Sequence, residues 1–207
     1  MPIAAARRLL ADTSFELVEV APGLARLFIV AADYRETTWG PCHERPLGFF
    51  VRLAGRPDQP DGLYVHRFPV DEAFTCVVGK EVMGYPVRIE LIDVQYTPED
   101  VTFRLAVGVQ PCLELRLPRK SRGHTAERCS MACYGSRDGV PFRMPMEMDT
   151  ITGMVDPGTI ELTLGSGPLA DELRALGLPQ APEICVWGEG VSAKFDESRP
   201  IDPIEDS

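Results

Sequence analysis

Residues 70–88 read Val70-Asp71-Glu72-Ala73-Phe74-Thr75-Cys76-Val77-Val78-Gly79-Lys80-Glu81-Val82-Met83-Gly84-Tyr85-Pro86-Val87-Arg88, and the fold prediction starts from them. This stretch predicts a strand, a Gly-Lys-Glu turn and a Gly-Tyr-Pro step into another strand. Alternation from residue 87 puts Val87, Ile89 and Leu91 on one face and Arg88, Glu90 and Ile92 on the other. If the apolar face looks inward, Arg88 points away from the interior unless a β-bulge follows Pro86.

Period-two alternation recurs along the whole chain and predicts ten short strands. They cover residues 15–20, 26–31, 48–53, 63–68, 74–78, 87–94, 101–107, 112–117, 159–164 and 184–193. One helix is expected at Pro168–Leu176, where leucines recur at helical spacing, and a short helical turn at Val78–Met83. Ser136-Arg137-Asp138-Gly139 predicts a hairpin turn. The fold class is therefore mainly β, a β-rich α+β fold: an antiparallel β-barrel or sandwich with one or two short helices.

Length and composition bound the organisation and the partners. The 207 residues, 44% of them hydrophobic, fit a single domain over 1–196, followed by an acidic, proline-interrupted tail at 197–207 that we expect to be disordered. A net charge of −10 and a pI near 4.8 disfavour binding to nucleic acid. No apolar run is long enough to span a bilayer, and Arg7 and Arg8 interrupt the N-terminal run. We expect a cytoplasmic protein that binds neither nucleic acid nor membrane.

Six cysteines are dispersed through the chain, and we expect most of them to be free, buried thiols. Cys129 and Cys133, with His124 upstream, form only part of a zinc pattern, because the two-residue spacing and a second ligand pair are missing. We therefore predict no metal site. The basic segment Arg116–Arg128 could attract a carboxylate, a phosphate or an acidic protein surface, or it could be a solvated loop.

The opening stretch, together with Thr38-Trp39-Gly40-Pro41-Cys42-His43-Glu44 upstream, resembles the acetoacetate decarboxylase family. In that family a Gly-Arg-Glu turn precedes an aromatic-Pro-Lys step, and an upstream Tyr-x-Glu precedes a pocket strand. The similarity runs without gaps over residues 71–88 and continues more weakly through 157–159, 168–169 and 184–195; the first forty residues match poorly. The resemblance implies that the predicted barrel or sandwich has this family's fold and assembles as a homo-oligomer.

The resemblance also implies a lysine that forms an imine with a ketone, an amine that acetoacetate decarboxylase activates through desolvation or a neighbouring cation. Here Val87 stands at that position, and Arg88 follows it where the family has a second lysine. An arginine stays protonated and forms no imine. Lys80, Lys120 and Lys194 are the only lysines in the chain, so a Schiff-base decarboxylase at the usual position is excluded.

Glu44 matches the family's pocket glutamate and is the first candidate catalytic residue. Beside an apolar Val87, its pKa would be raised by desolvation, which suits a general acid or base; an exposed strand-edge acid is the alternative. Arg88 is the second catalytic candidate, as an anion clamp, with a surface pairing to Glu90 as the alternative.

Five further residues are predicted to bind substrate: Trp39, Tyr85, Val87, Glu81 and His43. Trp39 and Tyr85 could line a cavity or pack in a core. Glu81 could brace backbone in its turn, with Lys80 as an ion-pair partner. His43 faces away from Glu44 on an extended strand, as a structural histidine would.

The leading hypothesis is a divergent enzyme of lyase or isomerase type, with no cofactor. It would act on a small keto- or enol-bearing metabolite, in secondary metabolism, through enolisation, dehydration, aldol or cyclisation chemistry with Glu44 as acid and base. A catalytically silent small-molecule-binding protein with the same pocket is the alternative. A scaffold that contacts another chain through exposed strands is the third possibility.

Overall fold

The computed structural model describes residues 1–10, 14–38, 40–119 and 121–201. The strands are β1 (Phe15–Leu17), β2 (Glu19–Ala21), β3 (Leu24–Ala25), β4 (Leu27–Ile29), β5 (Ala32–Tyr34), β6 (Cys42–Glu44), β7 (Leu47–Leu53), β8 (Gly62–Val70), β9 (Val87–Ile89), β10 (Leu91–Tyr96), β11 (Asp100–Val107), β12 (Gln110–Pro118), β13 (Arg122–Arg137), β14 (Val140–Val155), β15 (Glu161–Leu164), β16 (Cys185–Phe195) and β17 (Arg199–Pro200). The helices are α1 (Ile3–Arg7), α2 (Ala73–Val77) and α3 (Pro168–Ala175), with a π-helical turn at Val78–Val82 and a 3₁₀ turn at Pro157–Thr159. The prediction of a mainly β fold with short helices is confirmed.

Strand β8 is the centre of the large sheet. Its first half pairs with β7 in antiparallel fashion and with β13 in parallel fashion. Its last residues pair with β6 and, in parallel, with β9. The sheet continues through β14 to β16, and the pairings among the described strands do not close into a ring. The large sheet is thus mixed, where the sequence predicts antiparallel pairing throughout.

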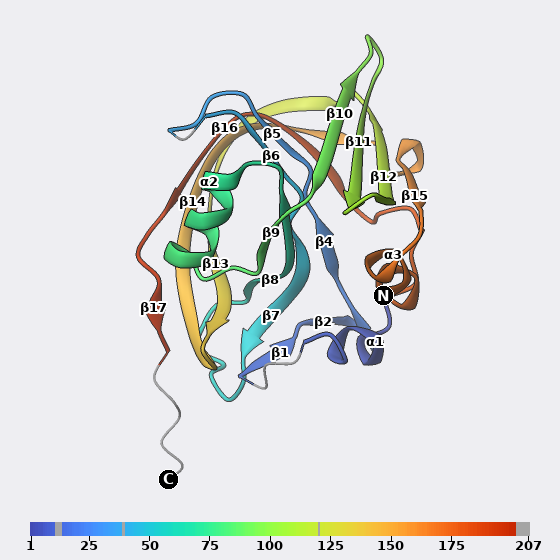
Figure 1. Cartoon of the computed structure of the whole chain (residues 1–207). Coiled ribbons are helices and arrows are strands. Elements are labelled where there is room, and N and C mark those ends of the chain that lie inside the picture. Colours follow the sequence, from blue (N-terminus) through green and yellow to red (C-terminus); the bar gives the residue numbers. More distant parts are fainter. Residues whose placement is uncertain (11–13, 39, 120, 202–207) are drawn as a thin grey trace.

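Two layers lie on opposite sides of this sheet (Figure 1). Helix α2 sits inside the curve of the sheet and contacts β8 and β9. Helix α3 contacts β12 and β15, which belong to the separate antiparallel sheet β10-β11-β12-β15 on the other side. We call the side of the sheet that carries α2 the inner face and the side toward α3 the outer face.

The segment 74–78 is a helix, and its prediction as a strand is wrong. Glu72 caps α2, because its side-chain carboxylate accepts a hydrogen bond from the backbone N–H of Thr75 at 2.7 Å. Parallel strands such as β8 and β9 also require a crossover connection, usually helical, and residues 71–86 supply it. The prediction of a helical turn directly after it is confirmed by the π-helical turn.

The structure also shows the outcome of four further predictions of local structure. The hairpin at 136–139 is confirmed: Asp138 and Gly139 both have positive φ, as a two-residue hairpin turn requires. The expected strand 87–94 is two strands, β9 and β10, in different sheets. The basic segment 116–128 is mostly the end of β12 and the start of β13. In the predicted tail, Arg199–Pro200 pairs with β14, while 202–207 lie outside the described residues.

Each face of the sheet has its own hydrophobic core. The outer core includes Phe15, Phe49 and Leu173 of α3. The inner core gathers eight buried residues around α2: Val65, Val70, Cys76, Tyr85, Val87, Cys133, Phe142 and Met144. Tyr85 and Val87 of the opening stretch therefore belong to the inner face.

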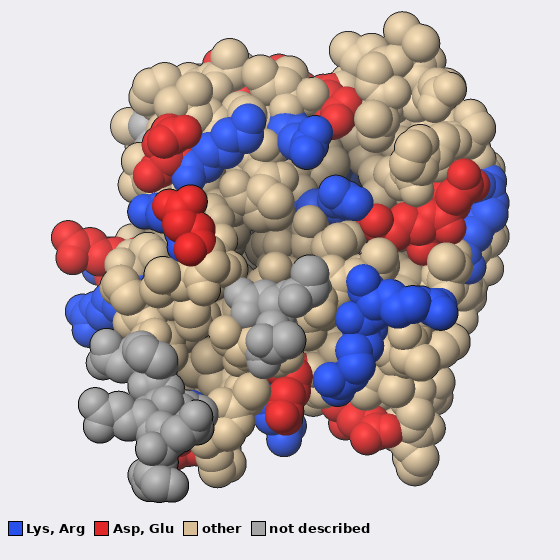
Figure 2. Space-filling view, turned by 60° about the horizontal axis from the view of Figure 1, so that its bottom comes forward, with Lys and Arg blue, Asp and Glu red and all other residues tan. Residues whose placement is uncertain are grey.

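Charge is distributed over the surface. On the face seen in Figure 2, Lys and Arg side chains are interspersed with Asp and Glu side chains. No helix among the described residues is long and apolar enough to cross a membrane.

The contact between Gly79 and Val87 yields a stability prediction. A Cβ added at Gly79 would lie 2.4 Å from Cγ2 of Val87, so Gly79→Ala must displace the buried valine. Overpacking costs about 1–3 kcal/mol, against a gain of up to about 1 kcal/mol from helix propensity. We expect a net loss of about 1–2 kcal/mol in the free energy of unfolding, measured by urea denaturation.

The control is Gly158→Ala, whose nearest neighbour would be an ordinary contact at 3.4 Å. In the double variant Gly79→Ala/Val87→Ala the two costs should be less than additive, because the shortened side chain leaves room. Additive costs would contradict the proposed contact.

Candidate active site

Strand β6 presents alternate residues to the two faces of the sheet. Glu44 pairs with Val70 of β8, and β8 pairs with β9 through Phe68–Val87 and Val70–Ile89. Because paired residues point to the same side of a sheet and side chains alternate along a strand, Glu44 and Val87 share the inner face with Val70. The family's pocket glutamate and the position of its lysine are thus brought to one surface.

Around Glu44 the inner face is mostly closed. Tyr34 of β5 pairs with Cys42, and Cys42 is 5% exposed and hydrogen-bonded to the Thr75 side chain of α2. Glu44 itself is partly exposed. Burial, followed by the Glu44 charge, raises the pKa of Tyr34, so this hydroxyl keeps its proton. The site therefore combines one accessible carboxyl with a neutral phenol and a neutral thiol.

The Glu44 carboxyl is the strongly perturbed acid of this region. Burial raises its pKa to about 7, and the nearby Asp71 carboxylate acts in the same direction. This is the direction expected from the sequence. A group with a pKa near neutrality can both accept and return a proton under physiological conditions.

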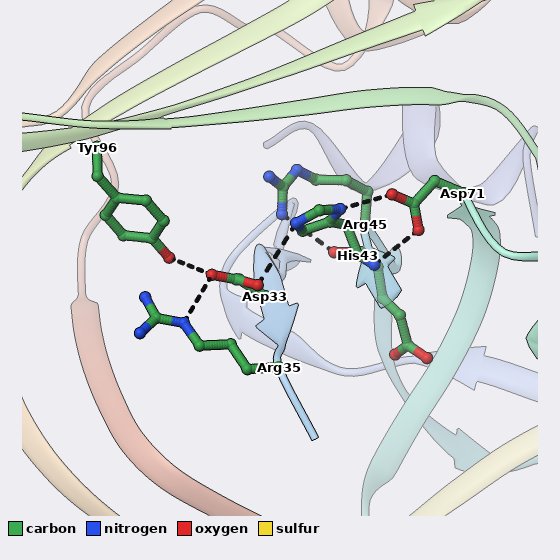
Figure 3. Close-up of polar contacts among 7 residues, drawn as sticks. Asp33, Arg35, His43, Arg45, Asp71 and Tyr96 are labelled. Atoms are coloured by element: carbon green, nitrogen blue, oxygen red, sulfur yellow. Dashed lines mark hydrogen bonds and ion pairs between the residues drawn. The ribbon is translucent and has the colours of Figure 1, made fainter. Parts of the chain in front are cut away.

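On the outer face a polar network fixes β6 (Figure 3). His43 Nδ1 lies 2.5 Å from Asp71 Oδ2, and the His43 backbone N–H donates to Asp71 Oδ1 at 2.7 Å. His43 Nε2 lies 3.4 Å from Asp33, which also accepts a 2.6 Å hydrogen bond from the Tyr96 hydroxyl. His43 is thus engaged on the side opposite Glu44, as the alternation along the strand predicts, and the structure does not bring it together with Glu44.

Arg45 anchors the same strand from the outer face. It is 1% exposed, its guanidinium carbon lies 3.8 Å from the centroid of the Phe103 ring, and it donates to the Glu44 backbone carbonyl at 3.0 Å. Burial lowers its pKa to about 9. Its contact with the four-stranded sheet holds the backbone of Glu44 in place.

The other predicted residues lie in different surroundings. Tyr85 and Val87 are 5% and 1% exposed and belong to the inner core, where Tyr85 packs on Phe68 and Phe142. Arg88 is exposed on the outer face, so the structure does not bring it together with Glu44. Glu81 is exposed on the π-helical turn. Trp39 lies outside the described residues.

Glu44 does not line either of two hollows found on the surface of the described residues. One, of about 370 Å³, lies along β13, β14 and β16, where Arg128 and Asp149 form an ion pair. The other, of about 250 Å³, lies on the outer face and includes Pro86 and Arg88.

The cysteines form neither disulfides nor part of a metal-ligand cluster within the described residues. All six cysteines are free thiols, four of them buried. Within the described part of the chain, no three histidine, cysteine or acidic side chains gather as metal ligands would.

Three residues near Glu44 were not predicted from the sequence: Tyr34, Asp33 and Arg45. Asp71 belongs to the opening stretch, but no role was predicted for it. Tyr34 and Asp33 come from β5, which precedes β6 in the part of the chain that matches the family poorly. Only the β5–β6 pairing brings them to the site. For Arg45, the available sequence signal was its position directly after the pocket glutamate, Glu44.

The fold and the inner-face carboxyl define a class, the acetoacetate-decarboxylase-like proteins. The profile of the family described as Acetoacetate decarboxylase (ADC) matches residues 1–198, and the chain belongs to this family. Comparison with curated protein sequences finds no match.

Solved structures of low sequence identity share the fold. An acetoacetate decarboxylase from Legionella pneumophila has a TM-score of 0.70 and 12% identity, over 95% of this chain and 79% of that one. The enduracididine biosynthesis enzyme MppR, complexed with pyruvate, has a TM-score of 0.57 and 16% identity, over 97% and 84%. An acetoacetate decarboxylase-like enzyme from Sphingomonas wittichii has a TM-score of 0.55 and 15% identity, over 96% and 86%.

The raised pKa of Glu44 makes a prediction about stability and pH. The folded state holds this proton up to about pH 7 and the unfolded chain only up to about 4.5, so the stability contributed by the neutral carboxyl is lost as the pH rises between these values. The loss amounts to about 3 kcal/mol. The Glu44→Gln variant has no carboxyl to ionise and should not show this loss. The free energy of unfolding of the variant, relative to that of the unmodified protein, should therefore increase between pH 5 and pH 8.

Urea denaturation at several pH values measures this difference. Glu16→Gln, which alters an exposed carboxyl on β1, is the control and should show no such trend. A constant difference for Glu44→Gln across the pH range would mean that Glu44 ionises normally.

Proposed function

We propose that the protein is an enzyme that enolises a small keto- or enol-bearing metabolite without a Schiff base, with Glu44 as the general base and acid. The observation that carries the proposal is a partly exposed carboxyl with a pKa of about 7 on the same face as Val87. Membership in the family and the pyruvate complex of MppR support a small oxo acid as the substrate class. Dehydration, aldol and cyclisation reactions all start from the same proton transfer.

The proton transfer follows from the surroundings of Glu44. As a carboxylate it takes a proton from the carbon next to the carbonyl, and the two electrons of the C–H bond become the enolate. The protonated Tyr34 hydroxyl and Cys42 thiol are the neighbouring groups able to donate hydrogen bonds to the enolate oxygen. Glu44 then returns the proton to carbon or to a leaving oxygen.

Exchange of the pyruvate methyl protons in D₂O tests this step, with ¹H NMR as the measurement. We expect a catalysed exchange whose rate rises with pH through about 7, because the carboxylate is the active form. Glu44→Gln should lower the rate about 100-fold or more, the usual contribution of a general base.

Glu16→Gln, on the distant strand β1, is the control and should exchange pyruvate at the unmodified rate. Unchanged exchange in Glu44→Gln would remove Glu44 from its role. A ligand that binds tightly and is recovered unaltered, with no exchange, would favour the silent binding protein.

Borohydride reduction in the presence of pyruvate separates this mechanism from imine chemistry. Val87 has no amine, and the described lysines, Lys80 and Lys194, are exposed. We therefore expect no reduced pyruvate adduct by intact-mass spectrometry. An adduct on any of the three lysines, Lys120 included, would contradict the proposal.

A further inference from the structure

The outer-face hollow of about 250 Å³ lies where three parts of the fold meet. Strands β8 and β9, the end of β11 and the start of α3 contribute its walls. Most of the lining is apolar: Phe68, Pro69, Pro86, Val107, Pro168 and Leu169. Such a surface suits a compact hydrocarbon group. The rest of the lining is charged: Arg67, Arg88 and Glu90.

Of the two arginines, one is already engaged. Arg67 donates to Glu172 of α3 at 2.7 Å, and Glu172 also lies 2.8 Å from His66. Burial opposes ionisation of Glu172, but these hydrogen bonds lower its pKa to about 2, so the carboxylate remains available to Arg67. Arg88 differs: no hydrogen bond or ion pair of its guanidinium is found within the described residues. It can therefore bind an anion.

Glu90 adds an opposite charge on the same side. Residues 88 and 90 are two apart on extended chain, so both side chains point to the outer face. Glu90 Oε2 accepts a hydrogen bond from the Gly108 backbone N–H at 3.2 Å, and the Glu90 backbone N–H donates to the Val70 carbonyl. No cation pairs with Glu90 in the part of the chain that the structure describes. Its second carboxylate oxygen can accept from a ligand.

We propose that this hollow binds an α-amino acid with an apolar side chain. Arg88 holds the carboxylate, Glu90 holds the ammonium group, and the apolar lining receives the side chain. A simple carboxylate would lie beside the Glu90 charge and an amine beside the Arg88 charge, whereas a zwitterion matches both. The site is on the opposite face of the sheet from Glu44 and does not depend on the proposed reaction.

Three probes of one carbon skeleton test the proposal: L-leucine, 4-methylpentanoate, which lacks the ammonium group, and 3-methylbutylamine, which lacks the carboxylate. Titration calorimetry with the full-length protein measures their dissociation constants. We expect L-leucine to bind at least about tenfold more tightly than either analogue, since each charge-assisted contact is worth that much. Equal binding of the three, or no binding of L-leucine, would overturn the proposal.

Two variants assign the contacts. Arg88→Gln should weaken L-leucine about tenfold without weakening 3-methylbutylamine, and Glu90→Gln should weaken L-leucine without weakening 4-methylpentanoate. Arg52→Gln, which removes the surface ion pair between Arg52 of β7 and Asp61, is the control and should bind like the unmodified protein. Circular dichroism checks that each variant is folded. Unchanged L-leucine binding in both Arg88→Gln and Glu90→Gln would place the ligand elsewhere and overturn the proposal.

Discussion

The pairing of one buried residue, Val70, with two neighbouring strands is the constraint on which the site depends. Val70 is 0% exposed and lies opposite Glu44 of β6 and Ile89 of β9. Because side chains alternate strictly along strands, this pairing sends Glu44 and Val87 inward and His43 and Arg88 outward. A slip by one residue would exchange the two sets.

The two faces use charge in different ways. Inside, burial removes water from Glu44 and no cation of the described residues pairs with its carboxyl, so its proton is held more tightly than usual. Outside, His43 contacts both Asp33 and Asp71, and Arg45 stacks on Phe103. These outer contacts fix the strand that carries the inner carboxyl, which is the preorganisation an acid–base site needs.

The same alternation leaves Arg88 and Glu90 as neighbours in a partly apolar hollow. The strand β9 thus contributes to an inner core through Val87 and to an outer hollow through Arg88. In this chain, Val87 at the family's lysine position and Arg88 directly after it therefore lie on opposite faces of the sheet.

Local periodicity, turn chemistry and a gapless motif were enough to predict the mainly β class, helix α3, the hairpin at Asp138-Gly139 and the family, and they made Glu44 the first candidate residue. The sequence also indicated that Arg88 faces away from Val87. It could not determine that residues 74–78 are helical, because their apolar alternation suits a strand and only the parallel pairing of β8 with β9 requires a crossover there. Only the packed fold brings Tyr34 and Asp71 close to Glu44 and places Arg88 and Glu90 in the same hollow as the start of α3, because these residues are far apart in the chain. Burial, which raises the pKa of Glu44, is likewise a property of the packed fold.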